Sequence, residues 1–167
     1  MKAVPPPSPS FHPGRDPAIV DDPVYDPYQD RSKLFEPSVC SDCGAVYLEE
    51  RWQWIAPPAH AMRIRCSACR RIHEEMPAGY VSIEGQFAHE HRKELIDFIR
   101  QLETYEKAQN PLERIMSIAE HDEKLAVTTT DIHLAHGIGE ALHHAYQGVL
   151  DLNYTDAEYL LRVRWQR

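Results

Sequence analysis

The sequence predicts an α+β protein with a small N-terminal four-cysteine unit, an amphipathic linking helix and a C-terminal ββαββ domain. Two observations carry this prediction. The four cysteines form two Cys-x-x-Cys pairs separated by 22 residues, and the second half of the chain alternates between strand-like and helix-like apolar patterns. The length of 167 residues, with 43% hydrophobic residues, suits one or two small globular units.

The first segment, residues 1–33, is predicted to be a disordered, proline-rich tail. Nine of the 13 prolines lie in residues 1–37, and no regular apolar period accompanies them. We interpret the segment as a solubilising tail that folding does not need. The alternative is that Tyr25, Tyr28 and Phe35 form a short docking motif.

The next segment, residues 34–78, is predicted to be a zinc ribbon. A Cys-x-x-Cys turn places two sulfurs on one ion, and Gly44 allows the backbone conformation that such a turn requires. A β-hairpin between the pairs would bring the second turn back to the first. The expected ligands of the Zn²⁺ ion are Cys40, Cys43, Cys66 and Cys69. A set of four cysteines leaves no open coordination position, which is typical of a structural site.

Two other uses of the cysteines stay open at this point. An iron–sulfur cluster takes the same ligands, and a single Cys-x-x-Cys pair can carry out thioredoxin-like redox chemistry. The start of the chain lacks the apolar core of a secretory signal, and no apolar run reaches the roughly 18 residues of a membrane span. We therefore expect a cytoplasmic protein without a membrane partner, in a compartment where disulfides are disfavoured.

The remaining chain divides into residues 79–110 and residues 111–167. The first part reads as a strand, "GYVSIEG", followed by a helix whose apolar residues recur every three or four positions until Asn110-Pro111 ends it. The second part reads as strands at "LERIMSIAE" and "LAVTTT", a helix that ends at Gly148, and strands at "VLDLNY" and "EYLLRVRW". Gly137 and Gly139 each cost that helix about 1 kcal/mol, which predicts a close approach to a strand or a ligand.

Positive charge gathers around the second cysteine pair. The formal net charge is −8, yet residues 51–73 hold five arginines and no carboxylate. A strand at "RWQW" would place both of its indoles on one face, either as a stacking platform for unpaired bases or as core. The candidate nucleic-acid-binding residues are Arg51, Trp52, Trp54, Arg63, Arg65, Arg70 and Arg71.

A catalytic site is not predicted. The chain contains no phosphate-binding loop, dinucleotide fingerprint, His-Glu-x-x-His motif or nucleophile elbow. His136 and Glu140 form an i, i+4 pair that could hold a metal, but we interpret this side of the helix as a solvated polar face. A face that contacts RNA or a protein is the alternative. We therefore expect a protein that is not an enzyme.

Five segments together resemble a family of short bacterial zinc-ribbon proteins of unknown function: "VCSDCGAVYLEERWQW", "RCSACRRI", "PAGYVSIEG", "NPLERIMSI" and "TTTDIHLAHGIGEALHHAYQG". The resemblance runs from about residue 25 to the end. The chain is also distantly similar to the nonsense-mediated-decay-type ribosome adaptors, which have further cysteine pairs and further domains. The resemblance implies association with RNA or the ribosome through the ribbon. The alternative expectation is a zinc-dependent protein–protein adaptor or regulator without RNA affinity.

Overall fold

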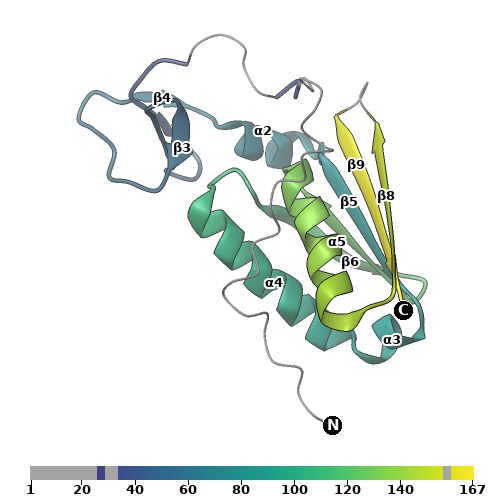
Figure 1. Cartoon of the computed structure of the whole chain (residues 1–167). Coiled ribbons are helices and arrows are strands. Elements are labelled where there is room, and N and C mark those ends of the chain that lie inside the picture. The colour runs from purple at the N-terminus through teal and green to yellow at the C-terminus, as the bar shows by residue number, and fades with distance from the viewer. Residues whose placement is uncertain (1–25, 29–33, 156–158) are drawn as a thin grey trace.

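The computed structural model describes residues 26–28, 34–155 and 159–167, which form two bodies joined end to end (Figure 1). We call residues 34–76 the cysteine unit and residues 78–167 the sheet domain. The cysteine unit contains β1 (Ser38–Cys40), β2 (Val46–Leu48), β3 (Arg51–Gln53), β4 (Met62–Ile64) and α2 (Ser67–Glu74). The sheet domain contains β5 (Gly79–Glu84), α3 (Gln86–Glu90), α4 (Arg92–Gln109), β6 (Ile115–His121), β7 (Lys124–Thr129), α5 (Ile132–Tyr146), β8 (Val149–Thr155) and β9 (Leu160–Gln166).

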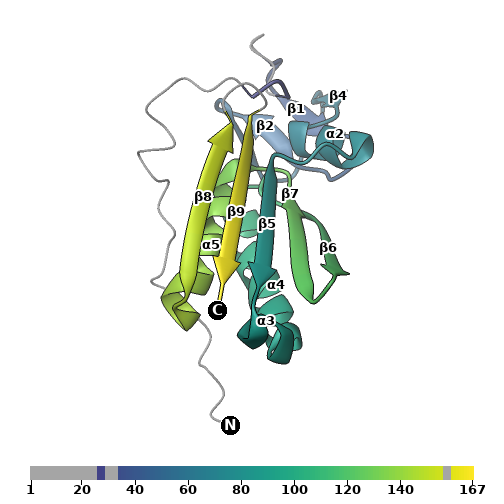
Figure 2. The same ribbon diagram turned by 90° about the vertical axis from the view of Figure 1, so that its right-hand side faces the viewer.

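A five-stranded sheet in the order β6-β7-β5-β9-β8 organises the sheet domain. Figure 2 shows one face of this sheet toward the viewer, with α4 and α5 behind the other face. β5 runs parallel to β9 and antiparallel to β7. From the sequence, this strand is predicted to belong to residues 79–110, a segment separate from residues 111–167. The pairing instead makes β5 the central strand of the sheet. Every second residue of β5 is buried, so one face of the strand contributes to the core beneath the helices.

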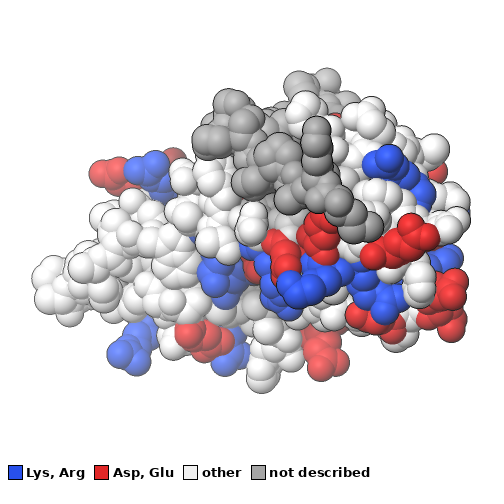
Figure 3. All heavy atoms as spheres, turned by 90° about the horizontal axis from the view of Figure 1, so that it is seen from below, with Lys and Arg blue, Asp and Glu red and all other residues white. Residues whose placement is uncertain are grey.

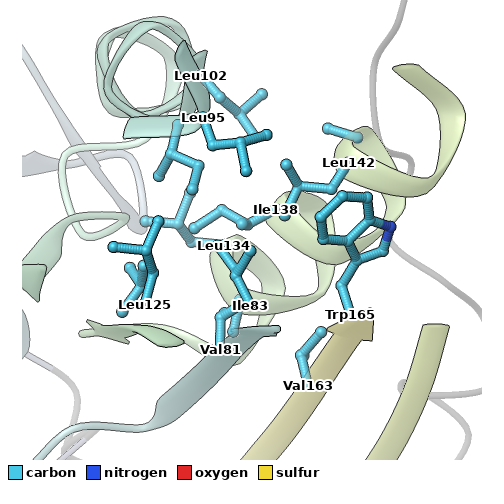
Figure 4. Packing of buried hydrophobic residues seen from close by; sticks show 14 of the residues in the cluster. Val81, Ile83, Leu95, Leu102, Leu125, Leu134, Ile138, Leu142, Val163 and Trp165 are labelled. Carbon is cyan, nitrogen blue, oxygen red and sulfur yellow. The ribbon is translucent and has the colours of Figure 1, made fainter. Parts of the chain in front are cut away.

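The core lies between the sheet and the two long helices (Figure 4). β9 supplies Leu161, Val163 and Trp165 to it, while the arginines between them are exposed on the open face. Helix α5 begins at Asp131, whose carboxylate accepts hydrogen bonds from the N–H groups of His133 and Leu134. Helix α4 ends before Asn110, as predicted, and a break at His91 separates it from α3. None of the helices in the described ranges combines the length and apolarity needed to cross a membrane.

Gly139 marks a close approach of α5 to the sheet. A Cβ atom at this position would lie 2.6 Å from Cγ1 of Val163 and 2.9 Å from Cδ1 of Leu150. Val163 is buried and β-branched, so its side chain has little freedom to move aside. The close approach predicted from the paired glycines is therefore found at Gly139, and it is made to strand side chains.

We expect Gly139→Ala to destabilise the fold although alanine is the better helix former. Overpacking a core costs about 1–3 kcal/mol, against a gain of about 1 kcal/mol in helix propensity. Urea unfolding should show a net loss of about 1 kcal/mol, within the range of these two estimates. His143→Ala, an exposed change on the same helix, should change stability by less than about 0.5 kcal/mol. A more stable Gly139→Ala protein would contradict the packing described here.

Candidate metal centre

The sulfur atoms of the four cysteines lie within 4.8 Å of one another, although the two pairs are far apart in the sequence. The Sγ atoms of Cys43 and Cys66 are 3.9 Å apart, and all four cysteines are free thiols. A tetrahedral ion with metal–sulfur bonds of about 2.3 Å separates its sulfurs by about 3.8 Å. The arrangement therefore fits a single four-coordinate ion and not a pair of disulfides, whose bonded sulfurs are about 2 Å apart.

The first cysteine pair lies on the turn between β1 and β2. The N–H of Gly44 donates to the carbonyl of Cys40 at 3.0 Å, and the N–H of Cys40 donates to Ala45 O at 2.8 Å. Gly44 adopts φ +80°, a conformation that side chains disfavour. The predicted role of this glycine in the turn is confirmed.

The second cysteine pair lies at the start of a helix, which differs from the predicted ribbon. Cys66 is the N-cap residue of α2, and its sulfur accepts from the N–H of Cys69 in the first turn at 3.4 Å. In the predicted zinc ribbon, this pair lies on a second Cys-x-x-Cys turn that a β-hairpin between the pairs brings back to the first. The stretch after Cys66 is rich in good helix formers, such as Ala68, Arg70 and Arg71, and these residues continue the turn as a helix.

Arg114 is a fifth residue of the site, and it comes from the sheet domain. Its Nη2 lies 3.2 Å from the sulfur of Cys66, 3.3 Å from that of Cys69 and 3.8 Å from that of Cys43. The residue is only 8% exposed. Arg114 is not among the residues predicted from the sequence, because nothing local in "NPLERIMSI" distinguishes it from a strand residue that faces solvent.

The thiols of the cluster differ in acidity. The hydrogen bond between the sulfurs of Cys43 and Cys66 lowers the pKa of Cys43 to about 4 and raises the pKa of Cys66. Burial raises the pKa of Cys69. Cys43 is the most exposed of these three cysteines, and the thiolate is the form of cysteine that binds metals.

The predicted basic patch does not form as expected. Arg71 is 3% exposed and pairs with Asp26, with 2.6 Å between Nη2 and Oδ1. Arg65 pairs with Asp42 at 2.6 Å on the surface. These two arginines already have carboxylate partners, so they are not free to form a groove for phosphates.

The other three arginines of the candidate set, Arg51, Arg63 and Arg70, are also at least partly exposed. The guanidinium of Arg70 lies 5.4 Å from the ring centre of Tyr28. Arg51 and Arg63 are exposed, and neither has an acidic partner among the residues that the structure describes. The strand register places both on one face of the four-stranded sheet, but on its two edge strands, β3 and β4. Three strand spacings separate them, about 14 Å.

The two tryptophans have structural contacts. Trp52 packs against the cysteine cluster, with its ring 5.4 Å from that of Tyr47. Trp54 is 40% exposed, and its indole N–H donates to the carbonyl of Lys107 in α4 at 2.7 Å. The core interpretation therefore describes Trp52, while Trp54 fastens the cysteine unit to the end of α4.

Part of the predicted disordered tail is packed. Asp26, which is 8% exposed, accepts from Arg71 and also from the N–H of Tyr28 at 2.9 Å. The Tyr28 ring lies 4.2 Å from the guanidinium of Arg71, and its hydroxyl bonds to Glu74. This corrects the expectation for residues 26–28, because a buried arginine in α2 requires a counter-charge. The remaining residues of the segment, with Tyr25, lie outside the described ranges.

Among the described residues, His136 and Glu140 on α5 do not belong to a cluster of three or more potential metal ligands, as the four cysteines do. His136 is 6% exposed, so it does not belong to a solvated helix face. Its Nε2 lies 3.8 Å from the carboxylate of Glu140. Within the described ranges, the four cysteines are the only group of three or more metal-ligating side chains.

The chain as described is an α+β protein with a four-cysteine site of metal-binding geometry. Compared with protein-family models, curated proteins and solved structures, it gives no match.

Proposed function

We propose that this protein is a non-enzymatic, zinc-dependent adaptor that binds another protein through its cysteine unit. Zn²⁺ is the ion that suits four thiolates in a tetrahedron, and a reducing compartment such as the cytoplasm keeps those thiols available. Four sulfurs complete the coordination sphere, so the ion would organise the fold and leave no position for a substrate.

The observation that carries the proposal is the exposed apolar surface of the cysteine unit. Of the nine exposed large hydrophobic residues in the described ranges, six belong to this small unit. They are Phe35, Trp54, Ile55, Met62, Ile72 and Met76. Seen from below, the projecting end that carries β3 and β4 is mostly uncharged (Figure 3). A small unit that exposes this many large apolar side chains is a candidate interaction site.

The charged residues beside this surface indicate what kind of partner it fits. Arg51 and Arg63 are exposed and lack acidic partners in the described part of the chain, and no lysine occurs between Lys33 and Lys93. Aromatic residues, methionine and arginine are enriched at protein interfaces, whereas lysine is depleted. The surface therefore suits a partner protein with an apolar patch and acidic residues around it.

The second candidate function is the association with RNA or the ribosome that the sequence favours. The two exposed arginines, Arg51 and Arg63, support it because arginine suits phosphate contact. The protein has a net charge of −8. On such a protein, two separated arginines support RNA binding less strongly than the five clustered arginines expected from the sequence.

Capture experiments with the zinc-loaded full chain as bait distinguish the two functions. For an adaptor, the same protein partner should be retained in about 0.5 M salt and after nuclease treatment, because apolar contacts are insensitive to both. It should be lost when Ile72 and Met76 are changed to aspartate. The matched control changes Val149 and Leu152, which are equally exposed on β8, to aspartate. Co-sedimentation with ribosomes that collapses as salt rises would favour the RNA function instead.

A further inference from the structure

Arg114 joins the cysteine site to the sheet domain, and we propose that it is a positioning residue of the metal centre. Through it, metal binding in the cysteine unit would stabilise the start of α5 in the sheet domain. The inference rests on the geometry of one side chain and its backbone, and it does not depend on which partner the protein binds.

The charge of the site explains why an arginine belongs there. Four thiolates around a divalent ion carry a net charge of −2, and burying this charge is costly without a counter-charge. Arg114 supplies one positive charge from inside the protein, at 3.2 and 3.3 Å from two of the sulfurs. In the described part of the chain it is the only arginine that donates to a cysteine sulfur. Groups of this kind tune the affinity of metal sites.

The backbone of Arg114 is tied to the residue that precedes the α5 cap. Its N–H donates to Oγ1 of Thr130 at 3.0 Å, and its carbonyl accepts from the N–H of Thr130 at 2.9 Å. The Thr130 hydroxyl also donates to the carbonyl of Leu112 at 2.6 Å. Thr130 is followed by Asp131, which caps α5. Hydrogen bonds thus connect the sulfurs to Arg114 and Arg114 to Thr130, and Thr130 is covalently joined to the residue that caps α5.

Loss of the ion would weaken this connection. The ion would hold four mutually repelling thiolates within reach of one guanidinium, and without it the sulfurs would lose the metal–sulfur bonds that fix their mutual distances. Arg114 would then be buried without its partners. Its Nε already has no hydrogen-bond partner among the described residues. The loop from residue 110 to 114 would open more often, and the Thr130 amide that it protects would exchange faster.

The first test measures zinc affinity by competition with a chromophoric chelator. Arg114→Met should weaken Zn²⁺ binding about 10- to 100-fold, the usual effect of removing a group that supports metal ligands. Arg114→Lys keeps the charge and should lose less. Arg162→Met, which removes an exposed arginine from β9, should bind zinc within about twofold of the parent, as surface changes usually do. Equal affinity in Arg114→Met would overturn the proposal.

The second test needs no variant, so it stands even if Arg114→Met fails to fold. Amide hydrogen exchange is compared in the zinc-loaded and chelator-treated full chain. Chelation should speed exchange at Thr130, His133 and Leu134 at least tenfold, while amides at the centre of β5 stay protected. In folded Arg114→Met these amides should exchange at the same rate with and without zinc. Unchanged exchange in the parent on chelation would show that the metal centre and α5 are independent.

Discussion

Cys43→Ser is expected to remove the metal and unfold the cysteine unit. The buried cluster around the sulfurs consists of three cysteines and one alanine, packed against partly buried Cys43, Trp52 and, from the sheet domain, Leu112. Ala45 and Val46 are the other buried apolar residues of this unit. So small a core cannot offset the entropy of ordering more than 40 residues. Structural zinc supplies about 10–16 kcal/mol of apparent binding free energy in small zinc domains. Loss of one ligand should therefore abolish the fold of this unit.

Metal analysis and spectroscopy check this prediction. Native mass spectrometry of the parent should show one zinc per chain, and Cys43→Ser should show none. Fluorescence from Trp52 and Trp54 should shift to that of exposed indoles, while the sheet domain keeps its circular dichroism signal, with local loosening at the start of α5. Ser41→Ala, an exposed change on the same turn, should retain the zinc. A folded, zinc-free variant would disprove the structural role, and visible absorption in the parent would indicate iron.

Asp26→Asn is expected to cost about 3 kcal/mol of unfolding free energy, the lower end of what breaking a buried ion pair costs. The reason is that Arg71 would remain buried at 3% exposure without its carboxylate. The guanidinium also donates to the carbonyl of Met76 at 2.9 Å, which holds it in place. It therefore has no short route to solvent.

The chain provides a matched control for this change. Asp42 pairs with Arg65 at the same 2.6 Å distance, but both side chains are about 40% exposed, so Asp42→Asn should cost less than about 1 kcal/mol. Adding Arg71→Met to Asp26→Asn should recover much of the loss, because replacing both members of a buried pair is often neutral. Urea unfolding gives the free energy of unfolding of the parent, the two single variants and the double variant. An Asp26→Asn protein as stable as Asp42→Asn would show that residues 26–28 do not hold Arg71 in solution.

Local patterns in the sequence determined the metal ligands and most of the secondary structure. The spacing of the two Cys-x-x-Cys pairs is enough to predict a metal site, and Gly44 indicates the turn that holds the first pair. The strands and helices after residue 78 show apolar periods of two and of 3.6 residues, which the backbone geometry of strands and helices imposes. These features depend on residues close in the chain, so they can be predicted without knowing the fold.

Only the tertiary structure decided which of these residues meet. It placed β5 at the centre of the sheet, Arg114 among the sulfurs and Asp26 against Arg71. It also paired two of the arginines expected to bind nucleic acid with carboxylates and placed two others on opposite edge strands. The contacts of β5, Arg114 and Asp26 each join residues more than 30 positions apart. A charged side chain looks the same in the sequence whether water or a buried partner neutralises it. The difference is set by the packing of distant elements, which exclude water from one arginine and leave another exposed.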